Sequence, residues 1–257
     1  MKTVLLAGGL GTRLREETEF RPKPMVPVGG RPILWHIMKT FAHFGHDEFV
    51  ICTGYRGDSI RQYFYEFEAM NSDFTVKLGS KERIKTHGVL EEAGWEVTVA
   101  DTGAETMTGG RIYKIRDHVG KDSFLCTYGD GLADVDISKL LKFHKSHGKV
   151  ATLTAVRPIS RFGVLDLSSD GLVESFQEKP QAEGWINAGY FVFEPKIFDY
   201  LEPNSILERE PMANLAKDGQ LVAFRHEGFF QPMDTYREMS MLNEMWDEGK
   251  APWKVWK

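Results

Sequence analysis

The chain has 257 residues, 42% of them hydrophobic and 27% charged, so it can bury a globular core without disulfide bonds or a structural metal. A net charge of −5 argues against a nucleic-acid partner, because binding to a phosphate backbone favours a basic surface. No window approaches the ~20 apolar residues of a membrane span, so we expect no membrane partner and a cytoplasmic location. Cys52 and Cys126 each lie in a short apolar run and are predicted to be buried and reduced.

The first half of the chain alternates between strand-like and helix-like apolar patterns. Strands are predicted at residues 3–7, 48–53, 74–78, 96–100 and 124–128. Pro32 is expected to open a helix that ends at Gly45, and Asp58 to cap a helix over residues 59–67. Alternating strands and helices predict a mostly parallel sheet with helices on both faces.

The second half adds a hairpin to this pattern. Strands are predicted at 150–156, 188–193 and 221–225, and residues 164–167 and 172–176 flank a Ser-Ser-Asp-Gly turn. Helices are predicted at 137–147, capped by Asp136, and at 195–201 and 235–248. We therefore expect an α/β fold in one domain, residues 1–257, with a mixed, mostly parallel, Rossmann-like sheet. Ligands of such sheets bind beyond the carboxyl ends of the strands.

A glycine-rich loop follows the first strand. Gly8, Gly9 and Gly11 allow the backbone to approach a ligand closely and to direct several N–H groups toward a phosphate. The spacing fits neither the dinucleotide-binding G-x-G-x-x-G nor the P-loop, since Leu14 occupies the third glycine position and no Gly-Lys-Ser or Gly-Lys-Thr follows. A tight turn without a ligand remains an alternative.

Four cations follow the loop: Arg13, Arg15, Arg21 and Lys23. Lys23 lies between Pro22 and Pro24, which restrict the backbone and aim one ammonium group at a fixed point. Such a group suits the charge that develops on a phosphoryl group in transfer. An exposed loop with ordinary basic residues is the alternative.

These two motifs together resemble the signature of the sugar-1-phosphate nucleotidylyltransferase family. The sequences concerned are Gly8-Gly9-x-Gly11-Thr12-Arg13-Leu14 and Arg21-Pro22-Lys23-Pro24-Met25. Further segments resemble the members that transfer a cytidylyl group from CTP to α-D-glucose 1-phosphate: Met107–Arg111, Thr127–Asp134, Gln231–Thr235 and Ala251–Lys254. The resemblance extends nearly end to end. It implies a nucleotide-binding half at about 1–130 and a sugar-phosphate-binding half at about 131–257.

The resemblance implies Mg²⁺ as cofactor, with Asp130 and Asp234 as its ligands. Mg²⁺ is typically held by one or two carboxylates together with substrate phosphates. Each aspartate has an alternative role. Asp130 could fill a Gly-Asp-Gly turn, and Asp234 could cap the last helix, although Thr235 and Glu238 match a capping box there.

The resemblance also assigns the remaining site residues. Arg13 and Lys23 are the expected catalytic residues. The expected nucleotide-binding residues are Leu6, Ala7, Gly8, Gly9, Gly11, Thr12, Arg13, Lys23, Thr102, Gly103, Arg111 and Gly129. The expected sugar-phosphate-binding residues are Gly163, Glu178, Lys179 and Asn187. The structural alternatives are that Arg111 begins a helix and that Glu178 and Lys179 form a surface pair.

The expected reaction is a direct displacement of pyrophosphate from CTP by glucose 1-phosphate. The alternatives are a nucleotidylyltransferase for UTP, dTTP, GTP or another sugar phosphate, a metal-dependent glycosyltransferase that uses Asp134 and Asp136, and a non-catalytic sensor. His144 and His147 are interpreted as hydrogen-bonded rather than metal-binding. The resemblance implies a homo-oligomer, with a hexamer as the expected number. Trp253 and Trp256 are interpreted as a core or subunit contact, and if the pair were exposed it would favour oligomerisation.

Overall fold

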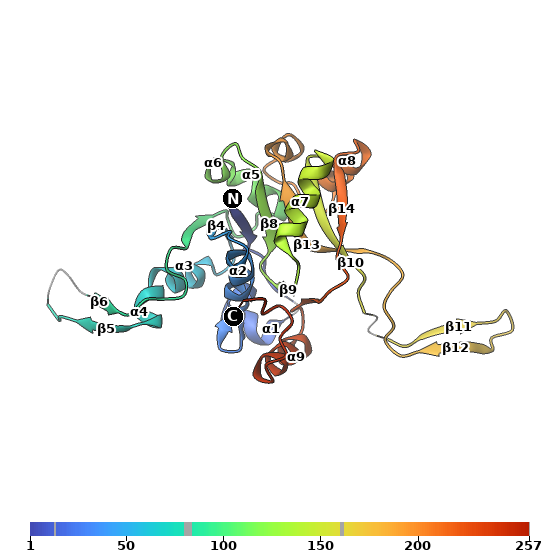
Figure 1. The fold of residues 1–257 in the computed structure, drawn as a ribbon, viewed down its shortest axis with the longest axis horizontal. Coiled ribbons are helices and arrows are strands. Elements are labelled where there is room, and N and C mark those ends of the chain that lie inside the picture. The colour runs from blue at the N-terminus through green and yellow to red at the C-terminus, as the bar shows by residue number, and fades with distance from the viewer. Residues whose placement is uncertain (13, 80–83, 160–161, 257) are drawn as a thin grey trace.

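The centre of the computed structural model, which describes residues 1–12, 14–79, 84–159 and 162–256, is a seven-stranded sheet (Figure 1). Across the sheet the strands are β14 (Leu221–Arg225), β10 (Ala151–Val156), β13 (Ile186–Phe193), β8 (Phe124–Tyr128), β1 (Thr3–Leu6), β4 (Glu48–Thr53) and β7 (Glu96–Asp101). Strand β13 is antiparallel to both neighbours, and the other pairs are parallel. The predicted mixed, mostly parallel α/β sheet is therefore confirmed.

Both faces of this sheet are covered, which explains why its strands read as continuous apolar runs. Successive residues of β1 face opposite ways, so Leu5 packs into one hydrophobic cluster and Val4 into another. The first cluster includes residues of α2 (Ile33–His43), α7 (Ile137–His147) and α9 (Tyr236–Asp247). The second includes residues of α5 (Thr108–Lys114), α6 (Arg116–Val119), the 3₁₀ helix η2 (Pro195–Tyr200) and α8 (Glu210–Lys217).

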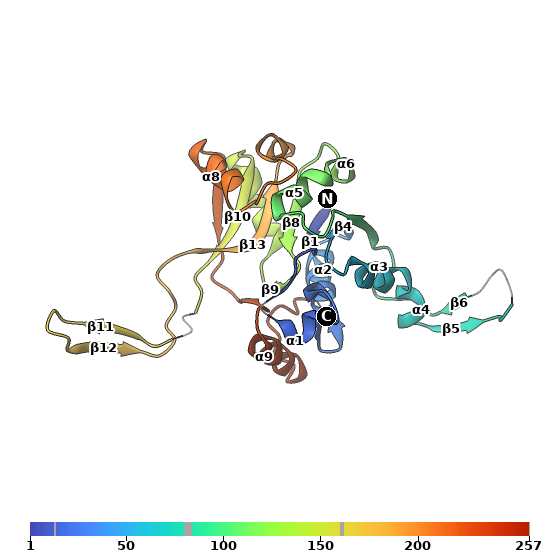
Figure 2. The ribbon, with the colours of Figure 1, turned by 180° about the vertical axis from the view of Figure 1, so that it is seen from behind.

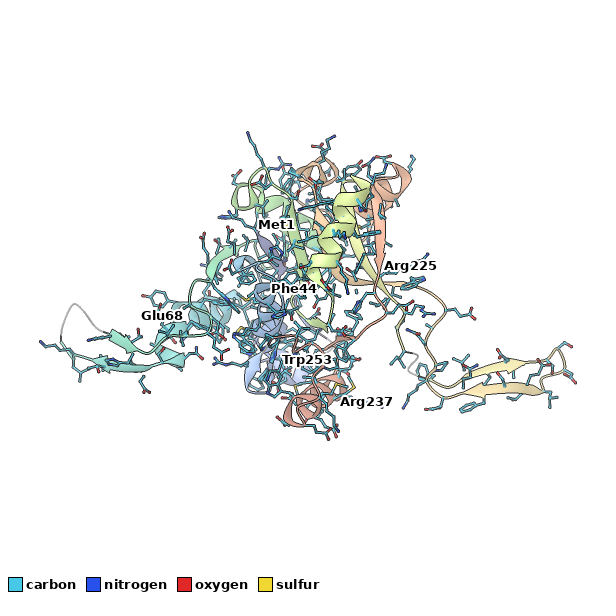
Figure 3. The ribbon with its side chains drawn as sticks, viewed as in Figure 1. Met1, Phe44, Glu68, Arg225, Arg237 and Trp253 are labelled. Atoms are coloured by element: carbon cyan, nitrogen blue, oxygen red, sulfur yellow. The ribbon has the colours of Figure 1, made fainter. Side chains whose placement is uncertain are left out.

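Two hairpins project from opposite sides of this body (Figures 1 and 2). One is β5 (Asp73–Val76) with β6 (Ile84–His87), and the other is β11 (Val164–Leu167) with β12 (Val173–Gln177). Both hairpins extend away from the body, as Figure 3 shows, and most of their strand residues are exposed. Hence the predicted hairpin is confirmed, whereas the run predicted at 74–78 belongs to a separate hairpin outside the main sheet.

The remaining short elements lie in the segments that connect the strands and helices already described. They are α1 (Arg15–Thr18), the 3₁₀ helix η1 (Lys23–Met25), β2 (Pro27–Val28) paired with β3 (Arg31–Pro32), α3 (Gly57–Tyr65), α4 (Phe67–Asn71), and β9 (Gly131–Ala133) paired with β15 (Phe230–Pro232). In the part of the chain that the structure describes, no helix has both the length and the apolar character that crossing a membrane requires.

Some predicted helix boundaries are wrong. Helix α2 begins at Ile33, with Pro32 in the capping position, and a positive φ at Gly45 follows its end. Helix α3 begins after Arg56, which adopts a left-handed conformation, so Asp58 lies in the first turn and does not cap the helix. Asp136 does cap α7, since its carboxylate accepts a hydrogen bond from the Lys139 N–H group at 2.9 Å.

The tryptophans near the C-terminus belong to the core of this chain. Trp253 is fully buried and Trp256 is 9% exposed, and both pack in the cluster that contains α2 (Figure 3 labels Trp253). The interpretation of the two tryptophans as a core contact is therefore confirmed, and they form no exposed pair that would favour oligomerisation. The rings of both tryptophans contact the His36 ring. His36 Nε2 lies 2.8 Å from the Val28 carbonyl oxygen, and His36 Nδ1 lies 3.4 Å from Trp253 Nε1.

Protonation of His36 should destabilise the fold. Burial lowers the pKa of His36 to about 4, with a smaller contribution from the charge of Arg31. Between pH 6.5 and 4, His36 binds a proton in the unfolded chain but not in the folded one. The free energy of unfolding that depends on neutral His36 is therefore fully present above pH 6.5 and is lost as the pH falls. The loss should reach about 3 kcal/mol.

Urea unfolding at pH 7 and pH 4.5 measures this dependence. His36→Gln should show a smaller decrease than the wild type, and His118→Gln, at an exposed position, should behave like the wild type. An equal decrease in wild type and His36→Gln would contradict the prediction.

Candidate active site

A cavity of about 760 Å³ lies at the edge of the sheet where β1 and β8 end and β13 begins. Because β13 is antiparallel to β8, its first residues meet the carboxyl ends of the neighbouring parallel strands. The glycine-rich loop, η1 and the start of α5 complete the walls. The lining includes Leu6, Ala7, Gly8, Gly9, Gly11, Thr12, Lys23, Arg111, Tyr128, Gly129, Asp130, Asn187, Glu208 and Asp234.

The glycine-rich loop is bound to the neighbouring strand end. The Ala7 N–H group donates to the Cys52 carbonyl at 3.0 Å, and the Gly8 carbonyl accepts from Tyr55 N–H at 3.2 Å. Gly11 has a φ of +63°, and a β-carbon there would lie 2.8 Å from Thr18 Cγ2, so only glycine fits. Gly9 borders open space, where a ligand can approach the backbone. Arg13, the other expected catalytic residue, lies outside the described residues.

Lys23 lies between the two predicted metal ligands. Its Nζ atom is 2.7 Å from Asp130 Oδ2 and 2.5 Å from Asp234 Oδ1. Burial alone would lower the pKa of Lys23, but the two carboxylates outweigh it and raise that pKa, so the ammonium stays charged. Two carboxylates from distant parts of the sequence therefore converge on one cation.

Local structure holds both aspartates in place. Asp130 follows β8, and its carbonyl accepts from Met233 N–H at 2.9 Å, which links it to the chain just before Asp234. Thr235 caps α9 in a capping box with Glu238, whose carboxylate also accepts from Asp234 N–H at 2.7 Å. The capping alternative for Asp234 is thus wrong, since Thr235 fills that role and the Asp234 side chain lines the cavity.

Arg111 holds the glycine-rich loop in place through a hydrogen bond to its backbone. It is 3% exposed and lies within α5. One terminal nitrogen donates to the Gly8 carbonyl at 2.9 Å, and the other donates to the carbonyls of Thr53 and Gly103 and to the Thr102 hydroxyl. Arg111 therefore connects the loop to the ends of β4 and β7. Thr102 and Gly103 do not line the cavity, but both contact residues that do, Arg111 and Thr106.

Among the charged residues on the described cavity wall, Glu208 is the one that the sequence predictions missed. Glu208 comes from the irregular segment before α8 and accepts hydrogen bonds from the hydroxyls of Tyr128 and Thr108. Burial, followed by the nearby charge of Glu208, raises the pKa of Tyr128, so the phenol keeps its proton and donates it. No periodic or motif signal in the sequence marks this segment.

The predicted sugar-phosphate residues are divided between two places. Asn187 lines the cavity, and its side-chain oxygen accepts from Gly189 N–H at 2.8 Å. Gly163, Glu178 and Lys179 lie next to the β11–β12 hairpin and do not line the cavity. Lys179 has a φ of +48°, and its Nζ atom lies 3.6 Å from Glu178 Oε1.

Two alternative sites from the sequence are explained by local contacts. His144 and His147 both contact the Thr152 hydroxyl, at 2.7 and 2.8 Å, and His144 also contacts Glu194, so both are hydrogen-bonded as interpreted. Asp134 pairs with His226 at 2.9 Å, and Asp136 caps α7. Among the described residues no group of three or more His, Cys, Asp or Glu side chains could hold a metal.

Comparison with known proteins adds independent information. The model of the nucleotidyl transferase family matches residues 2–219. A glucose-1-phosphate cytidylyltransferase from Salmonella typhi is 50% identical over 259 residues, with 100% of both chains covered. HddC from Yersinia pseudotuberculosis is 24% identical, with a TM-score of 0.70 over 95% of this chain and 99% of that one. A UDP-glucose pyrophosphorylase structure has a TM-score of 0.71 at 17% identity and covers 97% of this chain and 99% of that one.

Replacement of Arg111 should loosen the glycine-rich loop. Lysine cannot supply the two directed groups of donors that Arg111 uses, so Arg111→Lys should lower the free energy of unfolding by about 2 kcal/mol. Urea unfolding measures this change, and faster hydrogen exchange at the Tyr55 amide, which bonds to Gly8, would locate it. Arg61→Lys, at an exposed pair with Asp101, is the matched control. Equal stability of Arg111→Lys and the wild type would contradict the prediction.

Proposed function

We propose a specific reaction for this chain, which belongs to the nucleotidyl transferase family. It transfers the cytidylyl group of CTP to α-D-glucose 1-phosphate and releases pyrophosphate. Full-length identity of 50% to a glucose-1-phosphate cytidylyltransferase supports the substrates. The observation that carries the chemistry is the convergence of Lys23, Asp130 and Asp234 beside a glycine-rich loop.

The reaction is a direct displacement at phosphorus. A phosphate oxygen of glucose 1-phosphate forms a bond to the α-phosphorus of CTP while the bond from that phosphorus to the β-phosphate oxygen breaks. Pyrophosphate carries away the electron pair of the broken bond. The attacking phosphate is already ionised, so no general base is needed, and catalysis comes from positioning and charge stabilisation.

The nucleotide half of the cavity provides the groups for the triphosphate. The backbone N–H groups of Gly8, Gly9, Gly11 and Thr12 bind phosphate oxygens, and Lys23, together with Arg13, stabilises the charge on the α-phosphate and pyrophosphate. The backbone at Leu6, Ala7 and Gly129 contacts the nucleoside, since all three line the cavity. Thr102 and Gly103 act through Arg111, which positions the loop.

Asp130 and Asp234 fit the requirements of a Mg²⁺ ion. Their carboxylates already converge on a cation, the Lys23 ammonium, and Mg²⁺ needs few protein ligands when substrate phosphates supply the rest. When bound, the ion would neutralise negative charge on the α-phosphate and on the departing pyrophosphate. Lys23 then remains available to the phosphates from its fixed position between two prolines.

The sugar phosphate occupies the other end of the cavity. Asn187 at the start of β13 would contact a sugar hydroxyl. Lys179, Glu178 and Gly163, at the base of the β11–β12 hairpin and outside the lining of the cavity, remain the proposed contacts of the phosphate and of a further hydroxyl. A β-carbon on Gly163 would lie 2.7 Å from the exposed Phe176 ring, so a larger residue here would displace that ring.

Two further expectations accompany the reaction. We propose a homo-oligomer, with a hexamer as the expected number, and a cytoplasmic location. Free, buried Cys52 and Cys126 agree with a reducing compartment, and burial raises the pKa of Cys52 to about 12, so it is no nucleophile.

The reaction can be tested with a panel of nucleotides. Purified protein with Mg²⁺ and glucose 1-phosphate should release pyrophosphate with CTP and much less with UTP, dTTP, ATP or GTP. A colorimetric pyrophosphate assay measures the rates. Preferred release with another nucleotide would overturn the cytidylyl assignment, and no release with any of the five would overturn the reaction.

Loss of the Lys23 ammonium should reduce turnover far more than stability. Lys23→Ala should lower kcat by about 100- to 1,000-fold, because it removes a fixed positive charge from the reacting phosphates. Pyrophosphate release and urea unfolding, both with Mg²⁺ present, measure the two effects. Lys142→Ala, on α7 away from the cavity, is the control. A normal rate for Lys23→Ala would rule out its catalytic role.

A further inference from the structure

The start of α5 fits against the segment that precedes α8 and holds Glu208 in place. The Gly110 N–H group donates to the Ser205 carbonyl at 2.9 Å, and the Leu207 N–H group donates to the Thr108 hydroxyl at 2.9 Å. The Thr108 hydroxyl in turn donates to Glu208 Oε2 at 2.6 Å. These hydrogen bonds give the Glu208 carboxylate a fixed position on the cavity wall.

Glu208 in turn holds the side chain of Tyr128, the last residue of β8. The Tyr128 hydroxyl donates to Glu208 Oε1. The Tyr128 ring lies against Gly189 in β13, where φ is +78° and a β-carbon would lie 2.2 Å from Tyr128 Cδ2. The ring can therefore occupy this place only because position 189 is glycine.

Asn187 is the cavity residue that these contacts orient. Its Oδ1 atom accepts from the Gly189 N–H group at 2.8 Å, and a further side-chain hydrogen bond joins Asn187 to the Tyr128 hydroxyl. Burial and the charge of Glu208 raise the pKa of Tyr128, whereas the bond to Asn187 lowers it, which is the effect of a donor to the phenol oxygen. The amide oxygen and the amide nitrogen of Asn187 are thus both bound, and about one donor and one acceptor position remain for a ligand.

We infer that Tyr128 and Glu208 are positioning residues for the sugar phosphate, because they hold the Asn187 amide in one orientation. The inference rests on the proposed function, in which Asn187 contacts a sugar hydroxyl. A fixed amide presents its donor and its acceptor in constant places and loses less freedom when the sugar binds than a rotating one does. The pair therefore strengthens the binding of glucose 1-phosphate, while the triphosphate is bound by other residues.

Removal of the Tyr128 hydroxyl tests this role, since phenylalanine keeps the ring against Gly189. Tyr128→Phe should raise KM for glucose 1-phosphate by about 10-fold, and kcat and KM for CTP should stay near the wild-type values. Initial rates of pyrophosphate release, with each substrate varied in turn, measure these constants. Tyr200→Phe removes an exposed tyrosine–carboxylate hydrogen bond, to Asp218, and is the matched control that should behave like the wild type.

A double substitution separates positioning from direct contact with the sugar. If Tyr128 acts through Asn187, Tyr128→Phe should raise KM no further in a chain that already carries Asn187→Ala. Glu208→Ala should raise KM for glucose 1-phosphate as Tyr128→Phe does, and it serves if that variant does not fold. Glu208→Gln keeps an oxygen that can accept from the Tyr128 hydroxyl, so it should restore part of the wild-type affinity.

The two KM values and the double substitution also show what would overturn the inference. Equal changes in both KM values would mean that the pair only braces the cavity wall, and independent effects of the two substitutions would mean that Tyr128 touches the sugar itself. An unchanged KM for glucose 1-phosphate in Tyr128→Phe would overturn it as well. All three results leave the proposed function intact, whereas a wild type that releases no pyrophosphate from CTP and glucose 1-phosphate would overturn both.

Discussion

The ion pairs of Lys23 with Asp130 and Asp234 are the constraint around which the cavity is organised. They join residues 107 and 211 positions apart in the sequence, and each partner is held by its own local structure. Proline on either side fixes Lys23, the end of β8 fixes Asp130, and the capping box of α9 fixes Asp234. Two partly buried carboxylates this close repel each other, so this point needs a positive charge, which Lys23 supplies here and a bound Mg²⁺ would supply in its place.

A second set of contacts, centred on Arg111, fixes the glycine-rich loop relative to that cluster. The guanidinium occupies the space next to Gly8 and Gly54, where β-carbons would lie within 2.2 and 2.6 Å of its atoms. A buried arginine that binds backbone carbonyls adds rigidity because its planar donors accept few other geometries. The loop thus needs small residues for two reasons. A phosphate must approach its backbone from the cavity, and the Arg111 guanidinium packs against its other side.

The strands and the loops at their ends could be predicted because strands that are buried on both faces appear in the sequence as continuous apolar runs. Lys23, Asp130 and Asp234 are singled out by motifs that resemble those of a known family, whereas their convergence on one cation is a tertiary fact that no local pattern shows. Helix α5 could not be predicted, because Gly109 and Gly110 have low helix propensity, and contact with the 203–207 segment compensates for it.

Tertiary contacts also explain what else the sequence alone could not show. Trp253 and Trp256 occur at the end of a polar tail, where a local pattern shows no partner, and the His36 ring that they pack against is more than 200 residues away. The segment at 74–78 has the composition of a buried strand but pairs in an exposed hairpin. Glu208 illustrates the same limit at the site, because two hydroxyls on other elements give it its position.

The charge of the cavity gives the proposed metal a role in binding as well as in chemistry. The described lining contains three carboxylates, Asp130, Asp234 and Glu208, against two cations, Lys23 and Arg111. Arg111 is committed to backbone carbonyls and Lys23 is shared by two aspartates, so little positive charge is left for a triphosphate. A polyanion can enter this acidic environment only with a counter-ion, and a divalent cation on Asp130 and Asp234 would supply it where the transferred phosphoryl group must lie.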